Sequence, residues 1–157
     1  MKKSGTENLQ LRDRTGKKKQ EDKGMKVEFD NSLVTGNEMI DEQHKELIGK
    51  IDKLVNCCEQ GGGKLEAIKT LDYLSEYTDF HFGEEEKLQE QVAYPAMDEH
   101  KKQHAAFKKA VEELHEMLVE EEGPTDAFVV AVQKNVVDWL FNHIRNLDRA
   151  LAAYVQK

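Results

Sequence analysis

Seven side chains in this sequence have the chemistry and the spacing of ligands to metal ions. They comprise five of the six histidines and two carboxylates, in the order His44, His81-x3-Glu85, His100-x3-His104 and His143-x4-Asp148. Residues four apart on an α-helix lie on one face about one turn from each other, so each x3 pair can chelate one ion. Five imidazoles and two carboxylates cannot satisfy one another well inside a helical core. The series therefore predicts a buried metal site rather than a metal-free structural cluster.

The number and type of these donors indicate two ions. Seven donors exceed the four of a closed zinc site, whereas two six-coordinate ions bridged by two carboxylates need about this number and can leave one position open. Imidazole-rich donors with bridging carboxylates suit iron. In an α-helix the five-residue step from His143 to Asp148 turns about 140° beyond a full circle. We therefore expect Asp148 to reach sideways to a second ion.

Other polar residues near the series are not expected to join it. Glu84 and Glu86 flank Glu85, but only Glu85 lies one turn from a histidine of the series, so its two neighbours should face solvent. His115 lies eleven residues after His104, which places it ~16 Å farther along a helix axis. This separation is too large for a shared ion, so we expect His115 to be structural or exposed.

Four amphipathic segments must position the seven donors, and apolar residues recur in them every three to four positions. The segments span about residues 38–60, 64–91, 95–122 and 125–155, and the breaks contain Gly61-Gly62-Gly63, Ala93-Tyr94-Pro95 and Gly123-Pro124. Short connections make consecutive helices antiparallel, which predicts an all-α, up-down-up-down four-helix bundle with an N-terminal arm. In that topology all seven donors lie roughly 8–18 Å from the same end of the bundle. They therefore share one layer.

The charge distribution divides the 157 residues into two parts. Residues 1–24 hold eight Lys or Arg against four Asp or Glu, whereas residues 25–157 hold 15 against 27. We expect a disordered basic leader followed by one acidic bundle domain. An acidic body lacks the basic face that nucleic acid requires, and no apolar run is long enough for a secretory signal or a membrane span. The sequence thus predicts a cytoplasmic protein without nucleic-acid or membrane partners, in which the adjacent Cys57 and Cys58 are packing residues.

The seven-residue series, with Asp41-Glu42-Gln43 before His44 and Ile144 after His143, resembles the hemerythrin family over about residues 27–155. The segment from Phe29 to Ile40 is similar to the N-terminal arm of bacterial members. The resemblance implies two iron ions bridged by an oxo or hydroxo group and by both carboxylates, Glu85 and Asp148. It assigns His100, His104 and His143 to one iron, and His44 and His81 to the other. The two-histidine iron would keep a vacant position that binds O2.

The resemblance implies reversible O2 binding for storage, transport, delivery or scavenging, and not catalysis. Several apolar residues match positions that line the family's oxygen pocket, although each also suits an ordinary core: Leu47, Phe82, Trp139, Leu140 and Ile144. A diiron sensor of O2, NO or redox state is an alternative, but no output domain accompanies the bundle. A diiron oxidase or peroxidase-type enzyme is another. The ferritin-like class usually shows Glu-x-x-His pairs, and no Glu precedes a ligand histidine by three residues here. NO and small anions are further candidate ligands of the oxidised site.

Overall fold

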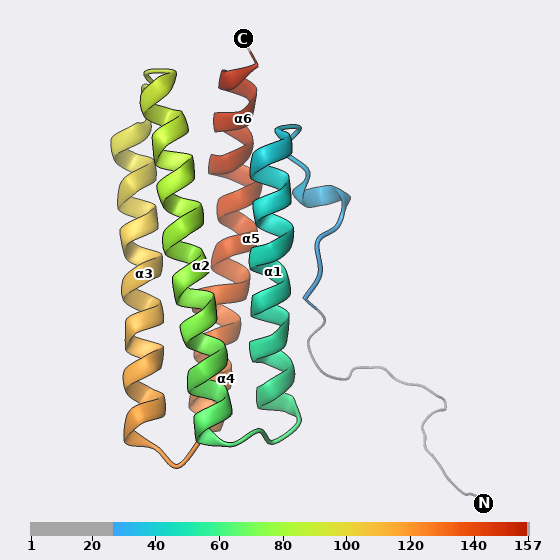
Figure 1. The fold of residues 1–157 in the computed structure, drawn as a ribbon, viewed down its shortest axis with the longest axis vertical. Helices are drawn as coiled ribbons and strands as arrows, with labels where there is room; N and C mark the ends of the chain where they lie inside the picture. Colours follow the sequence, from blue (N-terminus) through green and yellow to red (C-terminus); the bar gives the residue numbers. More distant parts are fainter. Residues whose placement is uncertain (1–26, 157) are drawn as a thin grey trace, which may run out of the picture.

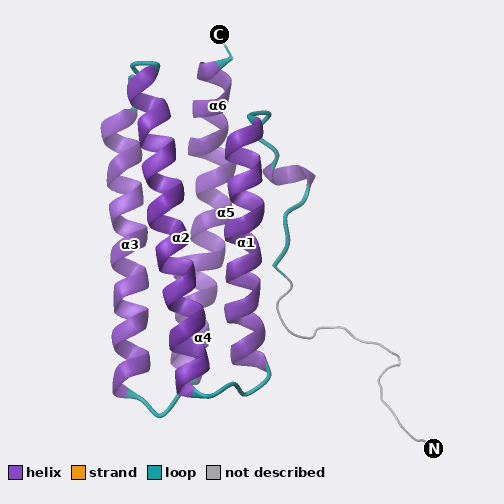
Figure 2. Ribbon diagram, viewed as in Figure 1, coloured by secondary structure: helices purple, strands orange, loops and turns teal. Residues whose placement is uncertain are grey.

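Four long helical rods lie side by side and alternate in direction in this computed structural model, which describes residues 27–156 (Figure 1). The predicted leader, residues 1–24, lies outside the described residues. The first three rods are α1 (Glu38–Glu59), α2 (Lys64–Gln91) and α3 (Met97–Glu120). Helices α4 (Asp126–Val132), α5 (Trp139–His143) and α6 (Arg149–Val155) form the fourth rod. Figure 2 shows helices and loops but no strand in the described part of the chain, which confirms the predicted all-α bundle.

The fourth rod is not the uninterrupted α-helix that its periodicity predicted. Two π-helical stretches, η2 (Gln133–Asp138) and η3 (Ile144–Asp148), join its three α-helical pieces. Backbone dihedral angles stay in the right-handed helical region at the junctions, so the rod remains continuous. Compared with a regular α-helix, the π-helical stretches therefore change which residues of this rod lie on the same face.

Local signals in the sequence explain where the rods begin and end. The side chain of Asn37 accepts the backbone N–H of Ile40 at 3.0 Å, and Thr125 Oγ1 accepts that of Phe128 at 3.1 Å. Both are N-caps that satisfy an otherwise unpaired helical N–H group. After α1, Gly61 adopts a positive φ of 71°, a conformation that glycine adopts without steric cost. The helix-breaking role of the glycine run therefore has a backbone cause.

The turn between α2 and α3 is longer than the sequence suggested. Helix α3 begins at Met97 and not at Pro95, because Ala93 has a positive φ of 51° and the following residues form hydrogen-bonded turns. The backbone N–H of Tyr94 donates to the carbonyl of Gln89 at 2.9 Å, and that of Met97 donates to Tyr94 at 3.2 Å. Proline precedes the helix here without entering its first turn.

An N-terminal arm packs along the bundle beside α1 (Figure 1). It contains the short 3-10 helix η1 (Asn31–Leu33), and the Leu33 side chain is fully buried in the core. Arg145 donates to Ser32 Oγ at 3.2 Å, and Arg149 donates to the carbonyl of Val34 at 3.2 Å. These contacts attach the arm to the part of the fourth rod that carries His143 and Asp148.

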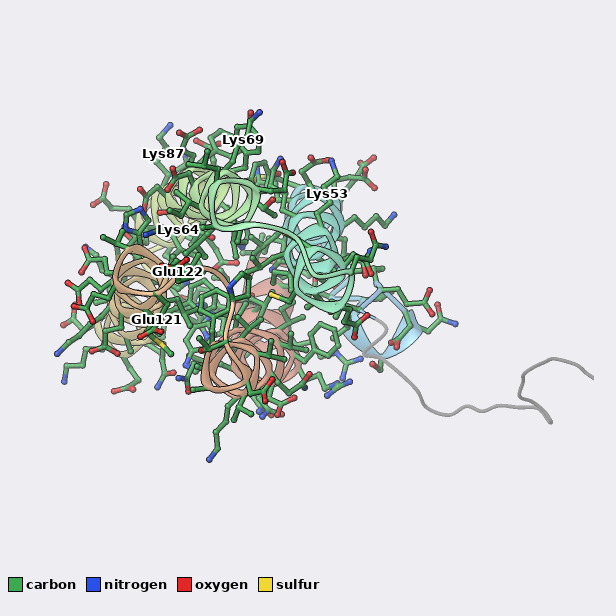
Figure 3. All side chains as sticks on the ribbon, turned by 90° about the horizontal axis from the view of Figure 1, so that it is seen from below. Lys53, Lys64, Lys69, Lys87, Glu121 and Glu122 are labelled. Carbon is green, nitrogen blue, oxygen red and sulfur yellow. The ribbon has the colours of Figure 1, made fainter. Side chains whose placement is uncertain are left out.

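The buried core runs the length of the bundle, and apart from Glu85 and Asp148 the carboxylate, Lys and Arg side chains of the described residues lie outside it. Figure 3 looks along the rods from the end opposite the arm-to-α1 turn, and it shows Lys53 and Lys69 projecting outward from α1 and α2. Cys57 and Cys58 are partly buried against the core, as predicted for packing residues. Within the described residues, we find no helix whose length and apolar composition would let it cross a membrane.

Candidate metal centre

The structure brings all seven predicted donors together near one end of the bundle. Each of these side chains is at least 96% buried. Their donor atoms form two groups, and within each group the atoms lie within 4.8 Å of one another. The larger group contains Glu85, His100, His104, His143 and Asp148, and the smaller contains His44, His81, Glu85 and Asp148. Both carboxylates belong to both groups, as expected of bridging ligands.

Each rod contributes to this layer at the depth that the antiparallel topology requires. Near its start, α1 supplies His44, while α2 supplies His81 and Glu85 near its end. Two histidines, His100 and His104, come from the first two turns of α3. The fourth rod supplies His143 from α5 and Asp148 from η3. Sequence spacing and the direction of each rod thus determine the layer.

The π-helical stretch η3 corrects the predicted geometry of Asp148. In a π-helix the backbone bonds run from residue i to i+5, and the N–H of Arg149 donates to the carbonyl of Ile144 in this way. Residues five apart then approach the same face, and Asp148 Oδ1 lies 3.2 Å from His143 Nε2. Asp148 Oδ2 lies 2.9 Å from His44 Nε2. The carboxylate reaches both groups, but through a local change of helix type rather than a sideways α-helical projection.

The donor atoms of the larger group face one another at short range. His100 Nε2 lies 2.9 Å from Asp148 Oδ1 and 3.1 Å from His143 Nε2. Glu85 Oε1 lies 3.0 Å from His104 Nε2 and 3.1 Å from His100 Nε2. Several imidazole nitrogens therefore converge on the two carboxylates, which is the arrangement of a chelating site.

Unpaired atoms in the smaller group test whether metal fits there. Five of its buried atoms have no aligned hydrogen-bond partner among the described residues, and four of these face the other donors: His44 Nε2, His81 Nε2, Glu85 Oε2 and Asp148 Oδ2. One from each member of the group, these atoms are the ones that would ligate an ion. Buried polar atoms without partners are rare in native structures and call for an ion or a water molecule. The donor set therefore fits a metal ion.

Burial and mutual repulsion keep two imidazoles of the metal-free cluster neutral. Burial, with the nearby His44 ring, lowers the pKa of His81 to about 3. Burial, with the nearby His100 ring, lowers the pKa of His104 to about 2. A neutral imidazole keeps a lone pair for a metal ion.

The pKa values of His100, Glu85 and Asp148 shift in different directions. Burial opposes the protonated form of His100, but hydrogen bonds to Asp148 and Glu85 outweigh it and raise the pKa of His100 to about 9. Burial, together with the charge of Asp148, raises the pKa of Glu85 well above its ordinary value. Burial acts in the same direction on Asp148, but the imidazoles of His143, His100 and His44 outweigh it and hold its pKa well below the ordinary value. Metal ions at this site would displace the protons on His100 and Glu85.

Three residues outside the series contact the Nδ1 atoms of three of its histidines, and the sequence analysis predicted this role for none of them. His81 Nδ1 lies 2.8 Å from Gln43 Oε1, and His100 Nδ1 lies 2.8 Å from the side-chain amide of Gln89. His104 Nδ1 lies 2.8 Å from Glu86 Oε2. Such partners fix the tautomer and the orientation of a ligating ring. The expectation that Glu86 simply faces solvent is wrong, because its carboxylate is only 28% exposed and contacts a histidine.

The remaining predictions for this region concern neighbouring residues. Glu84 pairs with Lys87 at 3.2 Å on the outer face, as expected. His115 has a half-exposed side chain and lies 3.7 Å from Asp72, apart from both donor groups.

Apolar and aromatic side chains surround the donors. The Phe82 ring stacks on His104 with ring centroids 3.7 Å apart, and Trp139 stacks on His143 at 4.6 Å. Leu47, Leu140 and Ile144 are fully buried in the same core cluster as Phe82. These five are the residues that the sequence suggested for an oxygen pocket. The structure places all of them in the helical turns next to the donors.

Comparison with known proteins gives consistent matches over most of the chain. The model of the hemerythrin HHE cation binding domain matches residues 35–155. A bacteriohemerythrin from Pseudomonas paraeruginosa is 34% identical over 127 residues, which cover 81% of this chain and 78% of that protein. One from Stenotrophomonas maltophilia is 30% identical over 128 residues, covering 82% and 80%. A crystal structure of wild-type hemerythrin superimposes with a TM-score of 0.67 at 26% identity, covering 78% of this chain and 92% of that one.

Proposed function

We propose that this chain, which belongs to the hemerythrin family, binds O2 reversibly at a non-heme diiron site. The family match confirms the resemblance seen in the sequence, and the buried cluster of His, Glu and Asp side chains supports a metal site. One observation carries the proposal: the two donor groups share both carboxylates but differ in their histidines, three in one and two in the other. A pair of ions held in this way would be inequivalent.

The unequal donor count suggests where a small ligand would bind. The ion held by His100, His104 and His143 would have five protein donors, counting the shared carboxylates. The ion held by His44 and His81 would have four. With an oxo or hydroxo bridge, a six-coordinate preference leaves one position free at the second ion. An iron pair, when bound, supplies the two electrons that O2 accepts reversibly.

The surrounding side chains suit reversible binding because they exclude water. Leu47, Leu140 and Ile144 are fully buried, and the stacked rings of Phe82 and Trp139 cover two of the ligand histidines. An apolar surrounding keeps water and its protons from the bound gas. We assign these five residues to the oxygen pocket on this basis.

We further propose a carrier rather than an enzyme. Five imidazole ligands with only two carboxylates would make the metal-bound site less anionic than a carboxylate-rich diiron site. The highly oxidised states used to oxidise substrates should therefore be less accessible. The proposal includes NO or small anions as further ligands of the oxidised site. It places the protein in the cytoplasm, where free thiols such as Cys57 and Cys58 stay reduced.

The proposal is tested by loading the protein with Fe²⁺ under anaerobic conditions, admitting O2 and recording the visible spectrum. We expect a charge-transfer band that appears with O2, disappears under vacuum and returns over repeated cycles. Protein loaded with Zn²⁺, which has no redox chemistry, is the control and should show no band. A band that decays irreversibly while peroxide or an oxidised product accumulates would refute the carrier function in favour of an enzyme.

A further inference from the structure

We propose that Glu86 is a positioning residue whose negative charge strengthens metal binding at the three-histidine position, beyond the advantage that its fifth protein donor gives. This inference rests on the metal site of the proposed function, but it does not depend on O2 binding. Three of the five ligand histidines have a side-chain partner on Nδ1, the ring nitrogen that faces away from the donor groups. Only one of these contacts involves a charged partner.

The contacts differ in charge although their lengths are equal. Each of the three distances from a histidine Nδ1 to its partner is 2.8 Å. The partners of His81 and His100 are the neutral amides of Gln43 and Gln89, whereas His104 has the carboxylate of Glu86. The Nδ1 atoms of His44 and His143 are buried without a hydrogen-bond partner in the described part of the chain. The only negative charge among these Nδ1 partners therefore lies beside the three-histidine group.

The geometry around His104 allows this charge to act on the metal through the ring. Its Nε2 points at the shared carboxylate, 3.0 Å from Glu85 Oε1, so Nδ1 carries the proton when Nε2 ligates an ion. The ring stacks on Phe82 at an interplanar angle of 4°, which fixes its plane. Nδ1–H then donates to Glu86 in a charge-assisted hydrogen bond, which makes Nε2 a stronger donor.

The surroundings of Glu86 leave its charge available. Glu86 lies on α2, and its carboxylate is 28% exposed, so it keeps part of its hydration and avoids the full cost of burying a charge. Among the described residues, no Lys or Arg lies within ion-pairing distance of it. The nearby Lys87 pairs with Glu84. Glu84 is therefore a matched control, since it lies on the same helix, has similar exposure and bears the same charge.

The experiment measures stepwise binding of Co²⁺ to the metal-free protein against a competing chelator. We expect two binding steps in the wild type. Glu86→Gln should weaken the tighter step by about 10–100-fold and leave the weaker step nearly unchanged. Glutamine still accepts the Nδ1–H bond, so this variant removes the charge and keeps the contact. Glu84→Gln should bind Co²⁺ like the wild type.

A second substitution adds a carboxylate beside a ligand histidine and should strengthen metal binding there. Gln43→Glu places a carboxylate on Nδ1 of His81, so it should tighten the weaker step and narrow the gap between the two. In the iron-loaded protein, the reduction potential should rise in Glu86→Gln, because a negative charge stabilises the ferric state. Circular dichroism confirms that each variant is folded.

The inference is overturned if Glu86→Gln loses no more affinity than Glu84→Gln. It is also overturned if Glu86→Gln binds normally and only Glu86→Ala is weakened, because the contact and not the charge would then matter. Failure of reversible O2 binding with these Co²⁺ results intact would count against the carrier function alone. Absence of two Co²⁺ steps in the wild type would count against both.

Discussion

Leu47 and Leu54 are both fully buried leucines on α1, but only Leu47 lies one turn from a histidine of the metal centre. Leu54 lies seven residues farther along, about 10 Å deeper into the bundle. Because the two side chains have the same volume and burial, a substitution at each costs a similar packing energy. Comparing the same substitution at these two positions therefore distinguishes an effect on water access to the metal centre from an effect on the stability of the fold.

Leu47→Ser should speed autoxidation of the oxygenated protein while the iron content stays near that of the wild type. A small polar side chain there opens space for water beside the centre. Both Leu47→Ser and Leu54→Ser should lower the free energy of unfolding, each by about 2–5 kcal/mol. Leu54→Ser should leave the autoxidation rate unchanged. Decay of the visible band in air measures the rate. Equal rates in the two variants would remove Leu47 from the oxygen pocket.

The thiol of Cys58 offers a test that depends on pH. Burial, with the charges of Cys57 and Glu59, raises the pKa of Cys58 to about 11. The thiolate is the nucleophile. At pH values below the pKa, its population should grow about tenfold for each unit by which the pH is raised. Iodoacetamide should therefore leave Cys58 largely unmodified at pH 8 in the folded protein and modify it in urea. Rapid modification of the folded protein at pH 8, seen by peptide mass mapping, would contradict the packing role.

At the scale of single residues, the sequence predicted which donors converge but not which groups support them. The seven donors follow helical spacing, and inward-facing ionisable groups require a common partner. Gln43, Glu86 and Gln89 were missed because their contacts depend on how neighbouring helices are aligned. Nothing in the spacing on one helix distinguishes Glu86, which touches a histidine of α3, from Glu84, which pairs with Lys87.

Among the helical elements, the fourth rod differs most from its prediction. Apolar periodicity indicated one α-helix, since a π-helical turn adds a residue without interrupting the helical appearance of the sequence. The consequence is functional, because η3 turns Asp148 toward His143 and His44. Such π-helical turns often occur at functional sites.

Deleting Asn146 should convert η3 into a regular α-helical turn and preserve metal binding. The histidine and the aspartate would then stand four residues apart, on one helical face. Asn146 is exposed, and its side-chain amide donates only to the carbonyl of Asn142, so little packing is lost. Metal content and circular dichroism should both stay close to wild type.

Deleting Ala105 from α3 is the matched control. Ala105 is also exposed, but it lies in a regular α-helix. Its loss rotates the buried residues that follow, including Phe107 and Val111, by about 100° away from the core. This variant should lose its cooperative unfolding transition. If the Asn146 deletion behaved in the same way, the π-helical explanation for Asp148 would be wrong.

For the molecule as a whole, we expect the bundle and its metal centre to unfold together. Alternating rod directions were predictable from the short breaks, and they place all seven donors at one end. The attachment of the arm to Arg145 and Arg149 was not predictable, because it depends on contacts more than 110 residues apart in the sequence. The donors come from all four rods, so binding of ions should stabilise the complete fold.

Removal of metal should therefore lower the melting temperature of the whole bundle. The metal-free core holds buried polar atoms without partners, and binding by the native state alone adds about 2.7 kcal/mol per ion at 100 times Kd. For a chain of this size, we expect the melting temperature to fall by about 5–10 °C for each ion removed. Calorimetry before and after chelation measures this change. Adding Zn²⁺ should restore the melting temperature, whereas Mg²⁺, which prefers oxygen donors, should not. A melting temperature unaffected by chelation would contradict this coupling.

The most direct test of the central claim is an anomalous-difference map from a crystal of the iron-loaded protein. We expect two iron peaks, one among His100, His104 and His143 and the other beside His44 and His81, with Glu85 and Asp148 between them. A single peak, or iron bound away from these seven side chains, would contradict the account.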